Sequence, residues 1–329
     1  MTTLEDVISR SEHRNWIARI SSKQLFWVFL AAVLACLALS LLTDSFATER
    51  NLFNVARNFA FVGIIAIGMT AVIASGGIDL SVGSSVVLSA MVISVTMEAG
   101  TPFLIAAPLA LLAAVLVGAL NGVLVAYAAM PPFVVTLGTL SAARSLAMVL
   151  SDNKMIWNFG PDHDLLIWVG GGATLGVPHP LYVLAALAFM MSVVFKWTRW
   201  GQHLFAIGSN ENAAILTGIP VRQMKVSIYV FSAFTAGLAG ILMAGWLGSV
   251  TTNLGQAMEL TVIAAAVIGG ANLAGGEGNA LGAVLGALLI EVIRNSLILL
   301  GISTFWQGMF IGTFIVVAVA FDRVRHFRS

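Results

Sequence analysis

Residues 76–84 read GGIDLSVGS and lie inside one long apolar region of the chain. FAFVGIIAIGMTAVIAS (59–75) precedes them and SVVLSAMVISV (85–95) follows. A carboxylate at the centre of a membrane costs about 2.5–3.5 kcal/mol on insertion scales. The glycines therefore predict a break in a membrane helix, and Asp79 needs a physical reason to be there.

Two roles for Asp79 are compatible with the surrounding residues. Gly76 and Gly77 allow the backbone to leave the helix, and the freed N–H groups then need acceptors. Asp and Ser are favoured N-caps, so Asp79 and Ser81 can cap the next helix. Alternatively, the break lines a transport path, because intramembrane charges often mark one. The two roles can coexist, and both remain open.

The composition extends this interpretation to the whole chain. The chain has 329 residues, of which 59% are hydrophobic and 9% charged, and its mean hydropathy is +0.97. Soluble domains contain about 25% charged residues. We predict an all-α, polytopic membrane protein with about ten transmembrane helices, some of them broken at Gly or Pro. The predicted spans are 25–43, 59–76, 82–98, 103–129, 132–150, 179–196, 226–247, 258–275, 279–300 and 303–321.

The distribution of Lys and Arg predicts the orientation of these spans. With both termini inside, 11 of the 16 basic residues fall on the inner side and 3 on the outer side. The chain then divides into a cytoplasmic N-terminal segment (1–24), a transmembrane permease domain (25–322) and a cytoplasmic C-terminal tail (323–329). The longest inner loop is 197–225.

Two further stretches resemble helix breaks. In MPPFVVTLGTL (130–140), Pro131 and Pro132 lack N–H donors and predict the start of a span. Thr136 and Thr139 are three residues apart and share a helix face. They line a polar path or bond back to their own helix carbonyls.

The second stretch is an echo of the first break. AVIASGGIDLSVGS (71–84) and AVIGGANLAGGEGN (266–279) both run from apolar residues through Gly-Gly to a polar residue, which is Asp79 or Asn272. This is a possible internal repeat of the kind that many transporters contain. Glycine-rich membrane segments also look alike without being repeats. The joins at 76–82, 129–132 and 275–279 are re-entrant turns or true loops.

The inner loop 197–225 contains a predicted short helix within NENAAILTG. Asn210 is its expected N-cap and Gly218 its terminator. The helix is either a docking element for a partner or an ordered connector. Among the charges in late spans, Glu291 and Arg294 are three residues apart and can pair.

The sequence lacks the common motifs of catalysis and nucleotide binding. It contains no P-loop, no HExxH and no G-x-S-x-G, so nothing supports an enzyme or ATP binding through a P-loop. Cys36 is the only cysteine, which excludes an intramolecular disulfide and a cysteine-based metal site. The net charge of +1 argues against a nucleic-acid partner.

Four ordered stretches resemble a known family. They are GGIDLSVGS, PPFVVTLGTL, AIGSNENAAILTGIPVRQMK and ELTVIAAAVIGGANLAGGEGNALGAVLGALLIEVIRNSLILLG. They are similar to the permease subunits of bacterial ABC importers for ribose, xylose, arabinose, galactose and autoinducer-2. The resemblance covers about residues 50–300 in the same order.

The resemblance implies a transport system in the bacterial inner membrane. Two permeases, identical or paralogous, form the pore, and a periplasmic sugar-binding protein delivers a monosaccharide. Two ABC ATPase subunits bind ATP and Mg, so this chain binds no cofactor and contributes a path that works by alternating access. The helix breaks themselves, and not the resemblance, indicate the candidate path or helix-break residues, which are Gly76, Gly77, Asp79, Ser81, Pro131, Pro132, Thr136, Thr139 and Asn272. The implied ATPase-coupling residues are Gly208, Asn210, Asn212, Ala213, Ala214, Gly218 and Ile219.

Two departures and three alternatives accompany the resemblance. Ile215 stands where the family commonly has a basic residue, and Asn272 where threonine or serine is common. Permeases for branched-chain amino acids have a similar loop, although GGIDLS favours sugars. An ion-coupled secondary transporter would need buried carboxylates, for which Asp79, Glu259 and Glu291 are the candidates. A structural scaffold would not explain the ordered breaks.

Overall fold

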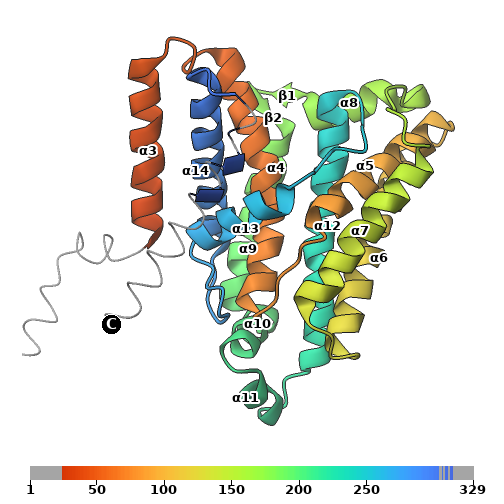
Figure 1. Ribbon diagram of the computed structural model, residues 1–329, viewed down its shortest axis with the longest axis vertical. Coiled ribbons are helices and arrows are strands. Elements are labelled where there is room, and N and C mark those ends of the chain that lie inside the picture. The colour runs from red at the N-terminus through yellow and green to blue at the C-terminus, as the bar shows by residue number, and fades with distance from the viewer. Residues whose placement is uncertain (1–23, 304–305, 307, 310–311, 314–329) are drawn as a thin grey trace, which may run out of the picture.

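The computed structural model describes residues 24–303, 306, 308–309 and 312–313, and helices dominate this part of the chain (Figure 1). The helices are α3 (Gln24–Leu42), α4 (Glu49–Ala74), α5 (Val82–Glu98), α6 (Phe103–Ala126), α7 (Pro132–Leu150), α8 (His163–Gly171), α9 (His179–Trp197), α10 (Arg199–Ser209), α11 (Glu211–Leu216), α12 (Val221–Leu247), α13 (Met258–Ile268) and α14 (Ala280–Leu299). A 3-10 turn covers Gly160–Asp162. The short strands β1 (Ala173–Thr174) and β2 (Val177–Pro178) pair antiparallel. The prediction of an all-α protein is confirmed.

Seven of the described helices are long and apolar enough to cross a membrane, namely α3, α4, α6, α7, α9, α12 and α14. The prediction of a multi-pass membrane protein is confirmed on this basis. Two predicted spans are shorter than a full crossing. The predicted span 82–98 is the 17-residue α5, and the predicted span 258–275 contains the 11-residue α13, which ends at Ile268.

Three predicted segments cannot be compared with the structure in full. The tenth predicted span, 303–321, lies mostly outside the described residues. The N-terminal segment 1–24 lies outside them except for its last residue, and the C-terminal tail 323–329 lies outside them altogether.

Two helices, α4 and α12, form the centre of the bundle. In the most apolar stretch of α4, 78% of the residues are buried, compared with 22% in α6 and 17% in α3. α12 packs against α4, α5, α6 and α8, while α14 packs against α3, α4 and α13. α3 lies at one edge and the α6–α7 pair at the other (Figure 1). The peripheral helices expose many leucines, as a hydrocarbon environment requires.

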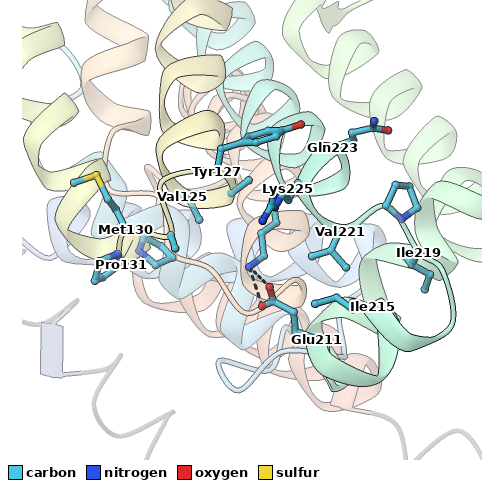
Figure 2. Close-up of a pocket in the computed structure, with 15 residues that line it drawn as sticks. Val125, Tyr127, Met130, Pro131, Glu211, Ile215, Ile219, Val221, Gln223 and Lys225 are labelled. Carbon is cyan, nitrogen blue, oxygen red and sulfur yellow. Dashed lines mark hydrogen bonds and ion pairs between the residues drawn. The ribbon is translucent and has the colours of Figure 1, made fainter.

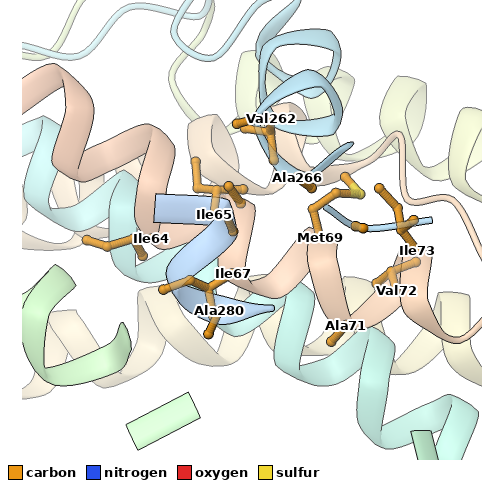
Figure 3. Close-up of a cluster of buried hydrophobic side chains, with 14 of the residues drawn as sticks. Ile64, Ile65, Ile67, Met69, Ala71, Val72, Ile73, Val262, Ala266 and Ala280 are labelled. Carbon is orange, nitrogen blue, oxygen red and sulfur yellow. The ribbon is translucent and has the colours of Figure 1, made fainter. Parts of the chain in front are cut away.

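The hydrophobic core gathers along α4. Ile65 and Met69 of α4 lie among Val262 and Ala266 of α13 and Ala280 of α14 (Figure 3). All five side chains are almost completely buried. The short helix α13 is therefore held against the central helix by side-chain packing.

Glycines allow the helices to approach closely. A Cβ at Gly240 of α12 would lie 2.4 Å from the carbonyl oxygen of Val86 in α5. A Cβ at Gly286 of α14 would lie 2.0 Å from the carbonyl oxygen of Ala265 in α13. Small residues favour such contacts in membrane bundles. The glycine-bearing faces of α12 and α14 are thus packing surfaces.

The two ends of the bundle differ in their connections. α10 and α11 project from one end, where α6 turns into α7, whereas α8 and the β1–β2 hairpin cover the other end (Figure 1). The basic residues Lys196, Arg199, Arg222 and Lys225 lie in or beside α10 and α11. Lys154 follows α7 at the opposite end.

Candidate functional site

The first helix break is present where the sequence predicts it. α4 ends at Ala74, and Gly76 has a φ of +81°, a conformation that favours glycine. The N–H of Gly77 donates to the carbonyl oxygen of Val72 at 2.9 Å, which closes the helix end. The chain then re-enters the bundle, and α5 starts about halfway along it (Figure 1). This join is therefore non-helical backbone that leads back into the bundle before α5 begins.

Asp79 is fully buried at this break, and its carboxylate is surrounded by donors. One oxygen, Oδ1, accepts the Ser81 backbone N–H at 2.9 Å and the Ser81 hydroxyl at 2.6 Å. The other, Oδ2, accepts the hydroxyl of Ser232 on α12 at 2.9 Å. Asp79 thus satisfies a freed N–H just before α5, as predicted. Ser81 occupies the N-cap position but makes no side-chain bond to the helix, so its predicted capping role is wrong.

The hydrogen bonds continue from Ser81 across two more helices. The amide of Asn121 in α6 donates to the Ser81 hydroxyl at 2.9 Å. The hydroxyl of Thr139 in α7 donates to Asn121 Oδ1 at 2.7 Å. All of these side chains are buried. Along this series of hydrogen bonds, each side chain donates to the next one in the direction of Asp79. We call Asp79, Ser81, Asn121, Thr139 and Ser232 the Asp79 network.

Sequence reasoning missed two members of the Asp79 network. Asn121 is a single amide within the apolar stretch 103–129, and Ser232 is one hydroxyl in the apolar α12. A polar residue inside a membrane span was the available signal for Asn121. Ser232 carried no such signal, because serine is common on membrane helices.

The proline pair behaves as predicted. α7 begins at Pro132, with Pro131 as its N-cap, and the connection 127–131 is a true loop because α6 and α7 are both long enough to span. Both threonines are within hydrogen-bond distance of their own helix carbonyls, as one of the two alternatives predicts. Thr136 donates to the carbonyl oxygen of Pro132 at 2.9 Å. Thr139 lies 3.2 Å from the carbonyl oxygen of Val135 and also donates across to Asn121 of α6 at 2.7 Å.

The second break lies between α13 and α14. The side chain of Asn272 accepts the N–H of Ala274 at 2.9 Å, which makes a local turn. Asn279 caps α14 by accepting the N–H of Leu281 at 2.9 Å. Asn272 is only half-buried, and its hydrogen bonds to Ala274, Gly275 and Glu277 remain within the turn. The sequence made Asn272 a candidate path or helix-break residue, and it lies in the turn of the second break, beside α10.

The two breaks and α10 meet at one point. The N–H of Gly276 donates to the carbonyl oxygen of Ala74 at 2.9 Å, so the second break caps the end of α4. Gly208 of α10 lies against both, because a Cβ there would be 1.8 Å from Ala74 O and 2.5 Å from Gly276 N. Neither contact atom belongs to a flexible side chain. Only glycine fits at position 208 without moving backbone.

The predicted short helix is α11. Asn210 is its N-cap and accepts the N–H of Ala213 at 3.0 Å, and Gly218 follows the helix with a φ of +80°. Asn212 and Ala213 are exposed, whereas Ala214 is buried within the chain. The two alanines among the implied coupling residues are therefore in different environments.

A cavity of about 780 Å³ separates α11 from the turn after α6 (Figure 2). Tyr127 and Pro131 line one side of it, and Ile219, Glu211 and Lys225 line the other. A smaller cavity of about 230 Å³ shares its Glu211 and Lys225 lining. It reaches the glycines of the first break and Tyr229 of α12. The first break is thus open toward the end of the bundle that carries α11.

Other charges within the bundle have local partners. The side chain of Arg144 in α7 donates to the carbonyl oxygen of Thr252 at 3.0 Å. Glu291 of α14 is buried and hydrogen-bonds to Asn58 of α4. Among the described residues, no group of three or more His, Cys, Asp or Glu is arranged to hold a metal ion.

Known proteins provide an independent comparison. Residues 51–319 match the family described as branched-chain amino acid transport system / permease component. The chain is 35% identical over 295 residues to the ribose import permease protein RbsC of Haemophilus influenzae, covering 89% of this chain and 91% of that protein. It is 37% identical over 297 residues to RbsC of Escherichia coli K12, covering 89% and 92%.

A third relative has a different sugar in its name. The chain is 33% identical over 306 residues to the D-allose transport system permease protein AlsC of Escherichia coli K12, covering 91% of this chain and 93% of that protein. No solved structure matches the chain. The family match covers most of the chain and includes both helix breaks and α11. The chain therefore belongs to this family and is the permease subunit of an ABC transporter, not an enzyme.

Proposed function

We propose that this chain is the membrane permease of an ATP-driven importer that takes up a monosaccharide, a ribose-like pentose or a related sugar. A periplasmic binding protein delivers the sugar, and the permease moves it by alternating access. The proposal rests on the relatives named for ribose and allose, whose similarity extends over about nine tenths of the chain. The geometry that supports it is the contact of α10, next to α11, with both helix breaks.

The setting of the permease is part of the proposal. It lies in the bacterial inner membrane and has both termini in the cytoplasm. The count of about ten spans includes 303–321 and also α5 and α13, each together with its adjoining non-helical backbone. The basic residues around α10 and α11 gather at one end of the bundle, which supports this orientation (Figure 1). The partners are a second permease, identical or paralogous, two ATPase subunits that bind ATP and Mg, and the binding protein.

The proposed mechanism assigns α11 to the ATPase and the breaks to the path. ATPase closure displaces α11, and the backbone contacts of Gly208 carry part of this displacement to Ala74 and Gly276. The Asp79 network joins the first break to α6, α7 and α12, so these elements move together. The path itself needs only weak substrate contacts, because the binding protein supplies selectivity and the sugar must leave again.

One rival substrate class follows from the family description, which names branched-chain amino acids. Uptake assays separate the two classes. In proteoliposomes that contain the complete complex, binding protein and ATP, we expect uptake of a labelled sugar from a ribose, xylose and allose panel. This uptake should persist when an uncoupler is added. If the complex takes up leucine but none of the sugars, the amino-acid class is supported. If the uncoupler abolishes uptake, an ion-coupled transporter is supported.

The docking role of α11 can be tested at its exposed alanine. We expect Ala213→Trp to abolish ATP-dependent uptake, because an α11 docked on the ATPase needs a small residue at the contact. Ala214 is less suitable, since its burial makes any replacement disturb the permease itself. Ala173→Trp changes an exposed alanine at the opposite end and should leave uptake unchanged. Normal uptake by the Ala213→Trp complex would contradict the docking role.

A further inference from the structure

One face of α12 contacts both α11 and the first helix break. Lys225, Tyr229 and Ser232 are spaced by four and three residues, which places them on the same side of the helix. Lys225 binds α11, the Tyr229 hydroxyl lies 3.5 Å from the carbonyl oxygen of Ile78, and Ser232 donates to Asp79. Three successive turns of α12 thus contact α11, the backbone of the first helix break and the buried carboxylate of Asp79.

The contact with α11 is an ion pair. Lys225 Nζ donates to both carboxylate oxygens of Glu211, at 2.7 and 2.8 Å (Figure 2). The Lys225 side chain is only 19% exposed, which limits the access of water to its ammonium group. The ion pair of Lys154 and Asp152 at the opposite end differs, because its partners are two residues apart, 3.4 Å from each other and over 70% exposed.

A cavity connects the ion pair with the break. Glu211 and Lys225 line the cavity of about 230 Å³ together with Gly76, Gly77 and Tyr229. A Cβ at Gly77 would lie 2.7 Å from the Tyr229 hydroxyl, so this hydroxyl contacts bare backbone. A displacement of this part of α12 therefore changes the contacts of the break directly.

We propose that the Glu211–Lys225 ion pair links α11 mechanically to the first helix break through the Lys225–Tyr229–Ser232 face of α12. Glu211 and Lys225 are positioning residues in this link. A helix segment of seven residues is about 10 Å long and stiff, so a pull on Lys225 displaces Tyr229 and Ser232 as well. The inference rests on the proposed function, because it requires that the ATPase moves α11.

The test measures movement at the break, and the labelling itself requires no sugar. Cys36→Ala removes the only cysteine, and Ser75→Cys places a thiol at the lining of the smaller cavity. The rate of N-ethylmaleimide labelling is compared in the complex with its ATPase, without nucleotide and with ATP and vanadate. We expect the nucleotide to change the labelling rate.

Breaking the ion pair should remove most of this change. We expect Lys225→Gln and Glu211→Gln each to reduce the nucleotide effect about fivefold, the upper range for a partly exposed ion pair. The exchanged pair Glu211→Lys with Lys225→Glu should restore it, which loss of local folding would not allow. Lys154→Gln, in the other ion pair, should change nothing. A full nucleotide effect in the single variants would overturn the inference.

A double variant tests the connection to Asp79. Lys225 and Ser232 lie about 10 Å apart, a distance at which mutational effects usually add. We expect Lys225→Gln with Ser232→Ala to be no worse than the more severe single variant, because both interrupt one link. Additive effects would overturn the inference. The inference would also be overturned if the unaltered complex takes up sugar but its labelling rate does not respond to nucleotide. If the unaltered complex shows no ATP-dependent uptake, the proposed function is refuted instead.

Discussion

The two helix breaks share a sequence pattern but are held by different contacts. At the first, Asp79 is fully buried and accepts hydrogen bonds from its own turn and from α12. At the second, Asn272 is half-buried and bonds within its own turn. Backbone packing holds the second break instead, because Gly275 and Gly276 lie against Gly208 and Ser209 of α10.

The difference shows how one local pattern can serve two structural purposes. The glycines end a helix in both places, since they permit conformations that other residues avoid. The polar residue then decides how the break is anchored. A buried carboxylate is stable only with hydrogen-bond donors around it. Asp79 therefore accepts hydrogen bonds from Ser81 and from Ser232 of α12. A neutral amide near the surface imposes no such demand, and the glycines around it allow backbone contacts.

The largest effect is expected when the anchor of the first break is removed. Asp79→Leu leaves the Ser81 N–H and the hydroxyls of Ser81 and Ser232 without their acceptor. Each buried group without a partner costs about 1–3 kcal/mol, so we expect little folded protein. Asp79→Asn should be much milder, because its amide oxygen still accepts from Ser81 and the Ser232 hydroxyl can turn to accept from its NH₂ group. Thermal unfolding in detergent measures both variants.

The same pair of variants separates structure from transport. If Asp79→Asn folds normally and transports well, then the hydrogen-bond geometry of the Asp79 network is what matters. If both variants fold but neither transports, then the negative charge itself is required in the path. That second outcome would make the first break a functional site of a different kind from the second.

An intermediate effect is expected at the point where the breaks meet. Gly208→Ala places a methyl group against Ala74 O and Gly276 N, which forces the backbone apart. Overpacking of this kind costs about 1–3 kcal/mol, and we expect a lower unfolding temperature together with reduced uptake. Gly138→Ala is the matched control, because this helical glycine has no neighbour within 4 Å of an added Cβ. Equal behaviour of the two variants would contradict the contact.

The smallest effect is expected at the second break. Asn272→Ala removes one hydrogen bond in a partly exposed turn, which should cost about 0.5 kcal/mol because water can replace it. Asn279→Ala removes the cap of α14 and should cost about 1 kcal/mol. Unfolding temperatures measure both. If Asn272→Ala abolishes transport while the protein remains folded, then the two breaks are more alike in function than their contacts suggest.

Much of this molecule is predictable from local sequence. The long apolar runs determine the helices, because a membrane helix needs about 20 apolar residues and satisfies its own backbone. Gly76, Pro132 and Gly218 mark where helices end or begin, because their backbone preferences act on their immediate neighbours. Asn210 caps α11 as predicted, since an N-cap contact spans three residues.

Local sequence was less informative where the contacts are distant. It indicated full spans at 82–98 and 258–275, yet α5 and α13 are shorter helices next to non-helical backbone. The apolar pattern is the same for a crossing helix and for a helix buried inside the bundle. Only the position of the neighbouring helices distinguishes the two cases.

The sequence by itself determined that the chain is a membrane bundle, that its helices break at glycines and prolines, and that α11 is a capped helix. The tertiary structure alone decided that Ser232, 153 residues away, donates to Asp79, and that Gly208 contacts both breaks. The reason is physical. Helix formation and capping depend on residues within one or two turns, whereas a hydrogen bond between distant segments depends on how whole helices pack.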